Sequence, residues 1–236
     1  GFQNPLSNHI FPYETAESAA TAASYTSDDY FGLLDDNEGE WVFTSIFNGT
    51  FERLDIGVGR LPLQTVAESD IMVDKLIAYD DPATFGSWRT TYTAIADDGP
   101  TGLAATQNDA DLHLSNIDQV AELITDEAFP KINMQKIYGE TYDRVFLGGY
   151  KIPEARRDIL DAIDRGTLVL NYSGHGGPDG LAQEGIFTRD DARLLTNGVK
   201  QPIVITATCS FGWWDLEEEQ SGAEVMLLNP DGGAIA

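Results

Sequence analysis

Cysteine and histidine are scarce in this chain, which contains one cysteine, Cys209, and three histidines. A single cysteine cannot form a disulfide within the chain, so we expect the hydrophobic core to hold the fold together. A zinc centre is disfavoured, because there is only one thiol and no histidine pair at ligand spacing. Long apolar runs are missing as well. No stretch reaches the roughly 18 apolar residues of a transmembrane helix, so we expect no direct membrane span.

Basic residues are also few: 14 lysines and arginines face 39 aspartates and glutamates, and the formal net charge is −25. Proteins bind nucleic acids largely by neutralising phosphates with basic side chains, so this balance excludes nucleic acid as a partner. Acidic pairs such as Asp35-Asp36 have the ligand chemistry of calcium sites, although we expect most of them to be solvated loops. The sequence therefore predicts no required cofactor and leaves calcium open.

Short β-branched apolar runs alternate with amphipathic stretches along the 236 residues. This alternation is typical of βαβ units, so we predict an α/β fold with a largely parallel sheet flanked by helices on both faces. The expected strands are 41–47, 54–58, 91–96, 132–138, 167–172 and 202–208. The expected helices are 66–80, 116–128, 154–164, 189–196 and 222–228.

Four of the expected helices begin with a capping pattern, in which Ser or Thr is followed three residues later by an acid. The four pairs are Thr65/Glu68, Ser115/Asp118, Thr188/Asp191 and Ser221/Glu224. Two runs, 168–170 and 203–205, are apolar on both faces and indicate buried parallel strands near the middle of the sheet. Residues 97–111 are expected to form a long acidic loop.

No internal repeat, low-complexity tract or linker divides the sequence, so we expect residues 1–236 to form a single domain. The chain starts in turn-rich residues and stops after glycines that follow a helix, where a further strand is expected. We therefore expect this domain to be truncated at both ends.

The cysteine and one of the histidines follow the two apolar strands directly. Residues 168–172 lead into Ser-Gly-His175-Gly-Gly, and residues 203–207 lead into Thr-Cys209-Ser. Ligands of open parallel sheets bind at the carboxyl ends of strands, where His175 and Cys209 can face one cleft. A thiolate and an imidazole placed there can carry nucleophilic catalysis. The alternative is that Cys209 packs as a small hydrophobe and His175 fills a turn.

Several motifs, in order along the chain, carry a resemblance to a known family. They are Tyr-Thr-Ser-Asp-Asp-Tyr-Phe at 25–31, Asp-Ile-Gly-Val-Gly-Arg-Leu-Pro at 55–62, Asn-Tyr-Ser-Gly-His-Gly-Gly at 171–177, Leu-Ala-Gln-Glu at 181–184, Phe-Thr-Arg-Asp at 187–190 and Ala-Thr-Cys at 207–209. This set resembles the gingipain family of cysteine peptidases, peptidase family C25, relatives of caspases, legumain and separase. It is most similar to the sortase-like peptidases of the type IX secretion system in Bacteroidetes.

The resemblance implies a caspase-like domain with a Cys–His dyad, in which Cys209 is the nucleophile and His175 the proton-transfer partner. The backbone N–H groups of Gly176 and Cys209 would form the oxyanion hole. The acid that orients the histidine would come from the pair that follows the strand at 91–96, and we choose Asp98 over Asp97.

Two further residues are candidates for substrate binding. Asp111 falls on the acid that recognises a basic P1 side chain in Arg-specific gingipains, and the alternative is an exposed residue near a helix start. Trp213 follows Cys209 closely enough to wall a substrate pocket, and the alternative is packing in a lid or in the core. We expect His9 and His113 to be ordinary surface or turn residues.

The resemblance further implies a cysteine endopeptidase at the extracellular face of a bacterial outer membrane. It would process carboxy-terminal sorting signals of secreted proteins through a Cys thioester and could transfer them to an amine of a surface lipopolysaccharide. Its partners would be cargo with a carboxy-terminal sorting domain and other type IX secretion components. A non-catalytic cargo-binding module and a calcium-stabilised surface module stay open as alternatives, because a peptidase-like fold does not by itself establish activity.

Overall fold

The computed structural model of the chain describes residues 12–14, 26–36, 38, 53–98, 108–215 and 219–236. For residues 14 and 108–111 it describes the backbone and not the side chains. The contacts divide the chain into two compact units, 1–62 and 63–236, which we describe separately. Within the described residues, no helix combines the length and the apolar character needed to cross a bilayer.

The first unit contains short elements. Strand β1 (Tyr13–Glu14) pairs antiparallel with β2 (Thr26–Ser27), and the 3-10 helix η1 (Asp29–Gly32) follows. Arg60 forms a bidentate ion pair with Asp28, with nitrogen–oxygen distances of 2.6 Å. This pair ties the end of the unit back to the start of η1.

The predicted strand at 54–58 is wrong, because these residues are irregular and their apolar side chains are exposed. Asp55 uses its side chain to accept a hydrogen bond from the Leu34 N–H at 2.8 Å, and glycines at 57 and 59 disfavour extended pairing. The predicted strand at 41–47 lies outside the described residues.

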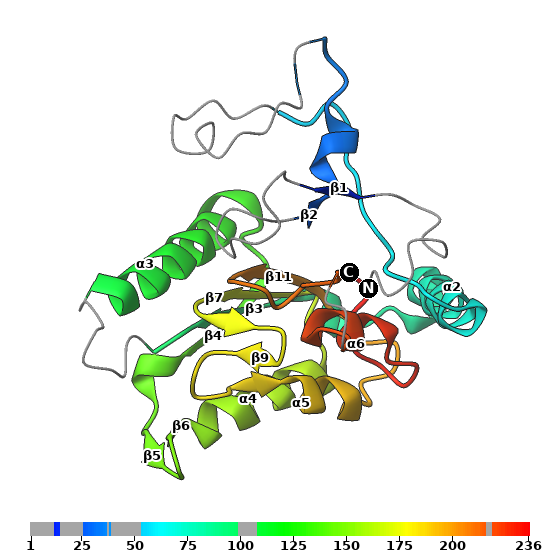
Figure 1. Ribbon diagram of the computed structural model, residues 1–236. Helices are drawn as coiled ribbons and strands as arrows, with labels where there is room; N and C mark the ends of the chain where they lie inside the picture. The colour runs from blue at the N-terminus through cyan, green and yellow to red at the C-terminus, as the bar shows by residue number, and fades with distance from the viewer. Residues whose placement is uncertain (1–11, 15–25, 37, 39–52, 99–107, 216–218) are drawn as a thin grey trace. The chain divides into compact units, whose positions relative to one another are not determined.

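A four-stranded parallel sheet forms the centre of the second unit (Figure 1). Its strands, in spatial order, are β11 (Ile203–Ala207), β7 (Val169–Ser173), β3 (Thr91–Ala96) and β4 (Asn133–Tyr138). All three neighbouring pairs run parallel. The strands predicted at 91–96, 132–138, 167–172 and 202–208 are confirmed, with small shifts at their ends.

Helices cover both faces of this sheet (Figure 1). On one face α3 packs against Tyr92, Ala94 and Ala96 of β3. On the other face, Ile95 joins a larger core built with three other helices. Successive side chains of a strand point to opposite faces, so β3 contributes to both cores. The predicted α/β fold with two helical layers is therefore confirmed. The helices are α3 (Asn108–Leu123), α4 (Pro153–Arg165), α5 (Arg189–Leu194) and α6 (Gly222–Leu228).

Helix α2 (Val66–Asp80) packs against α6. Shorter elements connect the helices and strands of this unit. The connections are the 3-10 helices η2 (Pro82–Thr84), η3 (Ser87–Thr90) and η5 (Gly139–Thr141), the π-helix η4 (Ile124–Ala128), the hairpin β5 (Val145–Phe146) and β6 (Tyr150–Lys151), and the antiparallel strands β8 (Gly176–Gly177), β9 (Gly180–Leu181) and β10 (Phe187–Thr188).

Capping boxes begin three of the helices, as predicted. They are Thr65/Glu68 at α2, Thr188/Asp191 at α5 and Ser221/Glu224 at α6. At α5 the carboxylate of Asp191 is buried and also accepts a hydrogen bond from Arg156 Nε of α4 at 3.0 Å. The same acid therefore serves two helices.

The predicted cap at Ser115 is wrong, and so is the loop predicted up to residue 111. Helix α3 begins at Asn108 and passes through Ser115, whose Oγ accepts a hydrogen bond from Gln119 Nε2 at 2.9 Å, one turn later. The residues before Ser115 continue the sheet-facing stripe of the helix, so no break is needed there.

The placement of β11 also corrects the sequence prediction. Among the described strands β11 lies at the edge of the sheet, whereas β7 lies inside. The side chains of Ile203 and Ile205 are 39% and 49% exposed, because α3 extends over β3 and β7 and leaves this face of β11 open.

Candidate active site

The pairing of β7 with β11 brings His175 and Cys209 to the same edge of the sheet. The register places Ser173 opposite Ala207, and each member of the dyad follows two positions later. The contact continues beyond the strands, where the Gly174 N–H donates to the Ala207 carbonyl at 3.2 Å. His175 and Cys209 are both exposed. The predicted adjacency of the two parallel strands is therefore confirmed.

Asp97 fixes the backbone of the histidine loop. Its Oδ2 accepts a hydrogen bond from the His175 N–H at 2.8 Å, and its Oδ1 accepts one from the Asp98 N–H at 2.8 Å. The Tyr172 hydroxyl donates to the His175 carbonyl at 2.6 Å, with Asp97 Oδ2 3.3 Å away. Burial, and then the charge of Asp97, raise the pKa of Tyr172, so this hydroxyl remains a donor. The loop is thus held on both sides of His175.

Gly176, the predicted oxyanion-hole residue, directly follows His175 and begins β8. The Ala182 N–H donates to the His175 carbonyl at 2.8 Å, so His175 and Ala182 form a hydrogen-bonded pair. Hydrogen-bonded and non-hydrogen-bonded pairs alternate along an antiparallel ladder, and the next pair, Gly176 with Leu181, is therefore a non-hydrogen-bonded pair of β8 and β9. The Gly176 N–H is therefore not used by the ladder. A Cβ at this position would lie 2.5 Å from Thr208 Oγ1, so the loop approaches the residue before Cys209 too closely for a side chain.

The turn that carries Cys209 is tightly constrained. Ser210 adopts a positive φ of 53°, which costs about 1 kcal/mol for a residue other than glycine. The Trp213 N–H donates a hydrogen bond to the Ser210 carbonyl at 3.2 Å and closes the turn. Phe211 is 1% exposed and meets Phe187 edge to face, with ring centroids 6.4 Å apart. The core thus anchors the turn immediately after Cys209.

The carboxylate of Asp98, the predicted orienting acid, pairs with Arg144, whose Nε lies 2.5 Å from Asp98 Oδ2. Arg144 Nη2 also donates to the Asp98 carbonyl at 2.9 Å. Burial raises the pKa of Asp98 to about 7, Glu184 and Asp97 add to this rise, and Arg144 opposes it. Asp98 therefore titrates near neutral pH. In the described contacts, the bond to the His175 backbone comes from Asp97.

Two groups of three carboxylates within the described residues are close enough to share a cation. They are Asp97, Asp98 and Glu184 near the dyad, and Asp35, Glu38 and Asp55 in the first unit. Arg144 already supplies a positive charge to the first group. In the second group, Asp55 and Glu38 accept hydrogen bonds from the backbone N–H groups of Leu34 and Asp35. Calcium binding stays a prediction.

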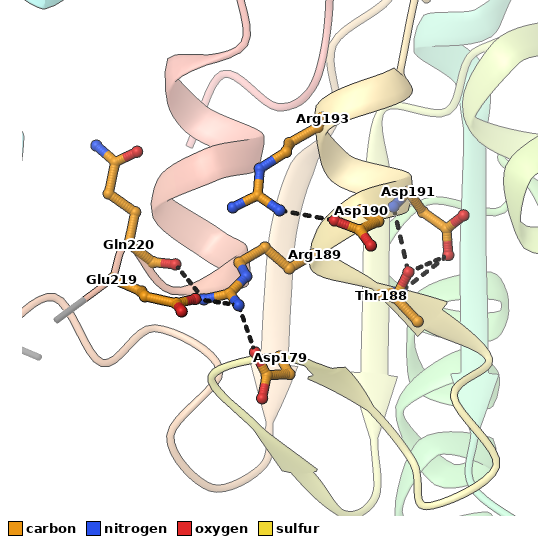
Figure 2. A network of polar contacts seen from close by, with 8 residues as sticks. All are labelled: Asp179, Thr188, Arg189, Asp190, Asp191, Arg193, Glu219 and Gln220. Carbon is orange, nitrogen blue, oxygen red and sulfur yellow. Dashed lines mark hydrogen bonds and ion pairs between the residues drawn. The ribbon is translucent and has the colours of Figure 1, made fainter.

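Arg189 joins the segments that follow His175 and Cys209, as Figure 2 shows. Its Nη2 lies 2.8 Å from Asp179 Oδ1 in the β8–β9 turn, and its backbone N–H donates to the Asp179 carbonyl at 2.8 Å. On the other side it forms an ion pair with Glu219 and donates to the Gln220 carbonyl at 3.1 Å. One guanidinium thereby ties together the two loops that flank the site.

The substrate-binding candidates have different placements. Trp213 lies on the turn after Cys209 and is 37% exposed. This position is compatible with both predicted roles, the wall of a substrate pocket and part of a lid. The backbone of Asp111 belongs to α3, two residues before His113, and its side chain lies outside the description. His113 contacts the ring of His175 and lies within α3, so it is neither the ordinary surface residue nor the turn residue that the sequence predicts.

The sequence assigned no role at the site to Arg144, Glu184 or His113, and Asp97 was only the alternative to Asp98. Glu184 did stand in a motif, and the Asp97-Asp98 pair was recognised as the source of the orienting acid. No local pattern marked Arg144 or His113, because their partners at the site are distant in the sequence.

The fold is similar to two solved structures. One is the Arg-specific cysteine proteinase gingipain R (RgpB), with a TM-score of 0.62 and 17% identity over 89% of this chain and 42% of that chain. The other is the complex of Porphyromonas gingivalis RgpB pro- and mature domains, with a TM-score of 0.62 and 17% identity over 91% of this chain and 44% of that chain. At this identity the similarity shows the fold.

The chain spans less than half the length of these structures. No curated protein sequence matches it. The sequence profile of Peptidase family C25, by contrast, matches residues 2–236. The chain therefore belongs to peptidase family C25.

Proposed function

We propose that this chain carries the catalytic dyad of a bacterial cell-surface cysteine endopeptidase of the sortase type, similar to PorU of the type IX secretion system. The observation that carries the proposal is the register of β7 with β11, which sets His175 and Cys209 at equivalent positions beyond two neighbouring parallel strands. Membership of family C25 supports a peptidase that uses a cysteine.

In the proposed reaction, His175 takes the proton of Cys209, and the thiolate attacks the scissile carbonyl carbon. The N–H groups of Gly176 and Cys209 would stabilise the negative charge on the carbonyl oxygen. The imidazolium then gives its proton to the departing amine as the C–N bond breaks, and a thioester remains on Sγ. Water or an amine next attacks the thioester, loses a proton to His175, and releases the thiol.

The proposed substrates are secreted proteins with a carboxy-terminal sorting signal, and the proposed acceptor is an amine of anionic lipopolysaccharide at the cell surface. Support comes from the resemblance of the motif set to sortase-like members of the family. A thioester serves hydrolysis and transfer equally, so the acceptor has to be tested separately.

Thiol reactivity tests the dyad. The described chain has one cysteine, so alkylation of the Cys209 peptide by iodoacetamide can be followed by mass spectrometry in the full-length protein. At about pH 6 an ordinary thiol reacts slowly, whereas a cysteine activated by an imidazole reacts fast. We expect His175→Ala to slow labelling by about tenfold or more. Equal, slow labelling of both proteins would instead favour a non-catalytic cargo-binding module.

Product analysis tests the transfer step. Purified cargo is incubated with the full-length enzyme, with and without a small primary amine, and the new carboxy terminus is weighed by mass spectrometry. Transfer predicts a product carrying the amine, whereas a peptidase that uses only water gives the free acid in both reactions. Cys209→Ala should give neither product.

A further inference from the structure

A second imidazole lies against the proposed catalytic histidine. The ring of His113 stands at 81° to the ring of His175, with the centroids 5.2 Å apart, which is an edge-to-face contact. His113 Nδ1 lies 3.4 Å from the Oγ of Ser173, the last residue of β7. Helix α3 therefore reaches the edge of the sheet where the dyad lies.

The position of His113 on α3 explains this contact. Residues four apart lie on one face of a helix, and Ile117 and Ala121 continue the stripe that starts at His113. Ile117 and Ala121 are 2% and 1% exposed and pack against β3. The stripe thus runs along the sheet, and its His113 end lies at the carboxyl ends of the strands. At that end the side chain is an imidazole instead of an aliphatic group.

The backbone bonds of the histidine loop do not determine where the His175 ring points. Asp97 and Tyr172 hold the N–H and the carbonyl of His175, whereas rotation about χ1 and χ2 is independent of both. The side chain is exposed and lies between two glycines. The contact from α3 is made with the ring itself.

We propose that His113 is a positioning residue, which holds the His175 ring in one orientation before the substrate binds; this inference rests on the proposed function. Placing a reacting group in advance lowers the barrier of the chemical step and leaves ground-state binding largely unchanged. In this proposal His113 orients the His175 ring through the packing of its own ring. Another flat aromatic side chain at position 113 should therefore have the same effect.

Kinetics of three variants in the full-length protein test this. We expect His113→Ala to lower kcat by about 10- to 100-fold with KM within about threefold of wild type. His113→Phe, which keeps a ring, should restore kcat to within about threefold, whereas His113→Gln should behave like the alanine variant. Leu114→Ala is the matched control, since Leu114 packs at the edge of the same α3 core. Melting temperatures identify any variant that fails to fold.

A spectroscopic readout separates this inference from the proposed function. In protein labelled with ¹³C at histidine Cε1, the His175 ring signals can be assigned with His175→Gln. We expect His113→Ala to remove the ring-current shift of these signals and Leu114→Ala to leave them in place. This measurement needs no turnover, so it decides the ring contact even if the protein shows no peptidase activity.

Four outcomes would overturn the inference, and the first three concern the His175 signal and kcat. They are an unchanged His175 signal in folded His113→Ala, an unchanged kcat in that variant, and a failure of folded His113→Phe to recover kcat. A loss confined to KM would also count against it, because it would assign His113 to substrate binding.

Discussion

The backbone N–H of His175 lies 2.8 Å from Asp97 Oδ2, so an acid at the end of β3 holds the loop at the end of β7. Asp97 is 3% exposed, and its second oxygen accepts the Asp98 N–H. A carboxylate can accept both bonds at once, whereas an amide has only one oxygen. The geometry of the histidine loop therefore depends on both carboxylate oxygens of Asp97.

Replacing Asp97 should damage both activity and stability. We expect Asp97→Asn to lower kcat/KM by about 10- to 100-fold and to cost about 1–3 kcal/mol of unfolding free energy, because a buried N–H loses its partner. Steady-state kinetics and urea unfolding measure the two effects. An active, equally stable Asp97→Ala protein would show that the loop holds its shape without this acid.

The dyad residues should be indispensable. In the full-length enzyme Cys209→Ala should abolish turnover, and His175→Ala should lower kcat by several orders of magnitude, because residues of one catalytic unit are strongly non-additive. Asp98→Asn should cost less than either, as expected for an orienting group. Cleavage of a cargo protein, followed by gel and mass spectrometry, measures all three. Wild-type turnover by Cys209→Ala is incompatible with the mechanism.

Asp98 should make the stability of the fold depend on pH. Its pKa is raised from 3.8 to about 7, so between these values the folded state binds more protons than the unfolded chain. The free energy of unfolding should therefore fall as the pH rises through this window, and the stabilising contribution should be lost above about pH 7. Asp98→Asn cannot titrate and should show a shallower fall between about pH 5 and pH 7.5 in urea unfolding. Parallel curves for the two proteins would refute this assignment.

A double substitution tests the close approach of the two loops. Gly176→Ala would place a Cβ 2.5 Å from Thr208 Oγ1 and should lower kcat/KM by about 100-fold or more. Thr208→Ala removes the closest obstructing atom and leaves the Gly180 carbonyl oxygen, 3.3 Å away, as the nearest neighbour, so Gly176→Ala/Thr208→Ala should recover about tenfold or more of that loss. The single Thr208→Ala protein is the control. If the double variant is no better than Gly176→Ala alone, the damage has another cause.

Asp111 remains the candidate for reading the P1 side chain. If its carboxylate lies in a partly buried pocket, pairing with a guanidinium should favour Arg or Lys at P1 by about 30- to 1000-fold over neutral residues. A P1 substrate library compared between wild type and Asp111→Asn measures this. Identical profiles would show that Asp111 has no role in specificity, as expected for an exposed carboxylate whose preference is removed by solvent screening.

The parts of the fold that local patterns determine could be predicted from the sequence. The β-branched runs located β3, β4, β7 and β11, and capping boxes located the starts of α2, α5 and α6. The adjacency of β7 and β11 followed from the length of one crossover. These patterns were enough to predict that His175 and Cys209 lie at the same edge of the sheet.

Other features depend on contacts that no local pattern encodes. Ser115 has the same cap pattern as a true helix start, yet the helix runs through it because its stripe continues to His113. The 203–205 run is apolar on both faces, but its burial depends on whether a helix covers β11. The pairing of Arg144 with Asp98 joins segments far apart in the sequence.

Asp191 should make α4 and α5 unfold together. Its buried carboxylate closes the cap of α5 and also receives Arg156 of α4, so loosening either helix deprives this carboxylate of a partner. Such a loss costs about 1–3 kcal/mol, which couples the fraying of the two helices. Their amide hydrogens should therefore exchange with solvent through a shared opening. The crossover that joins His175 to Cys209 thus draws part of its rigidity from the helix that precedes it.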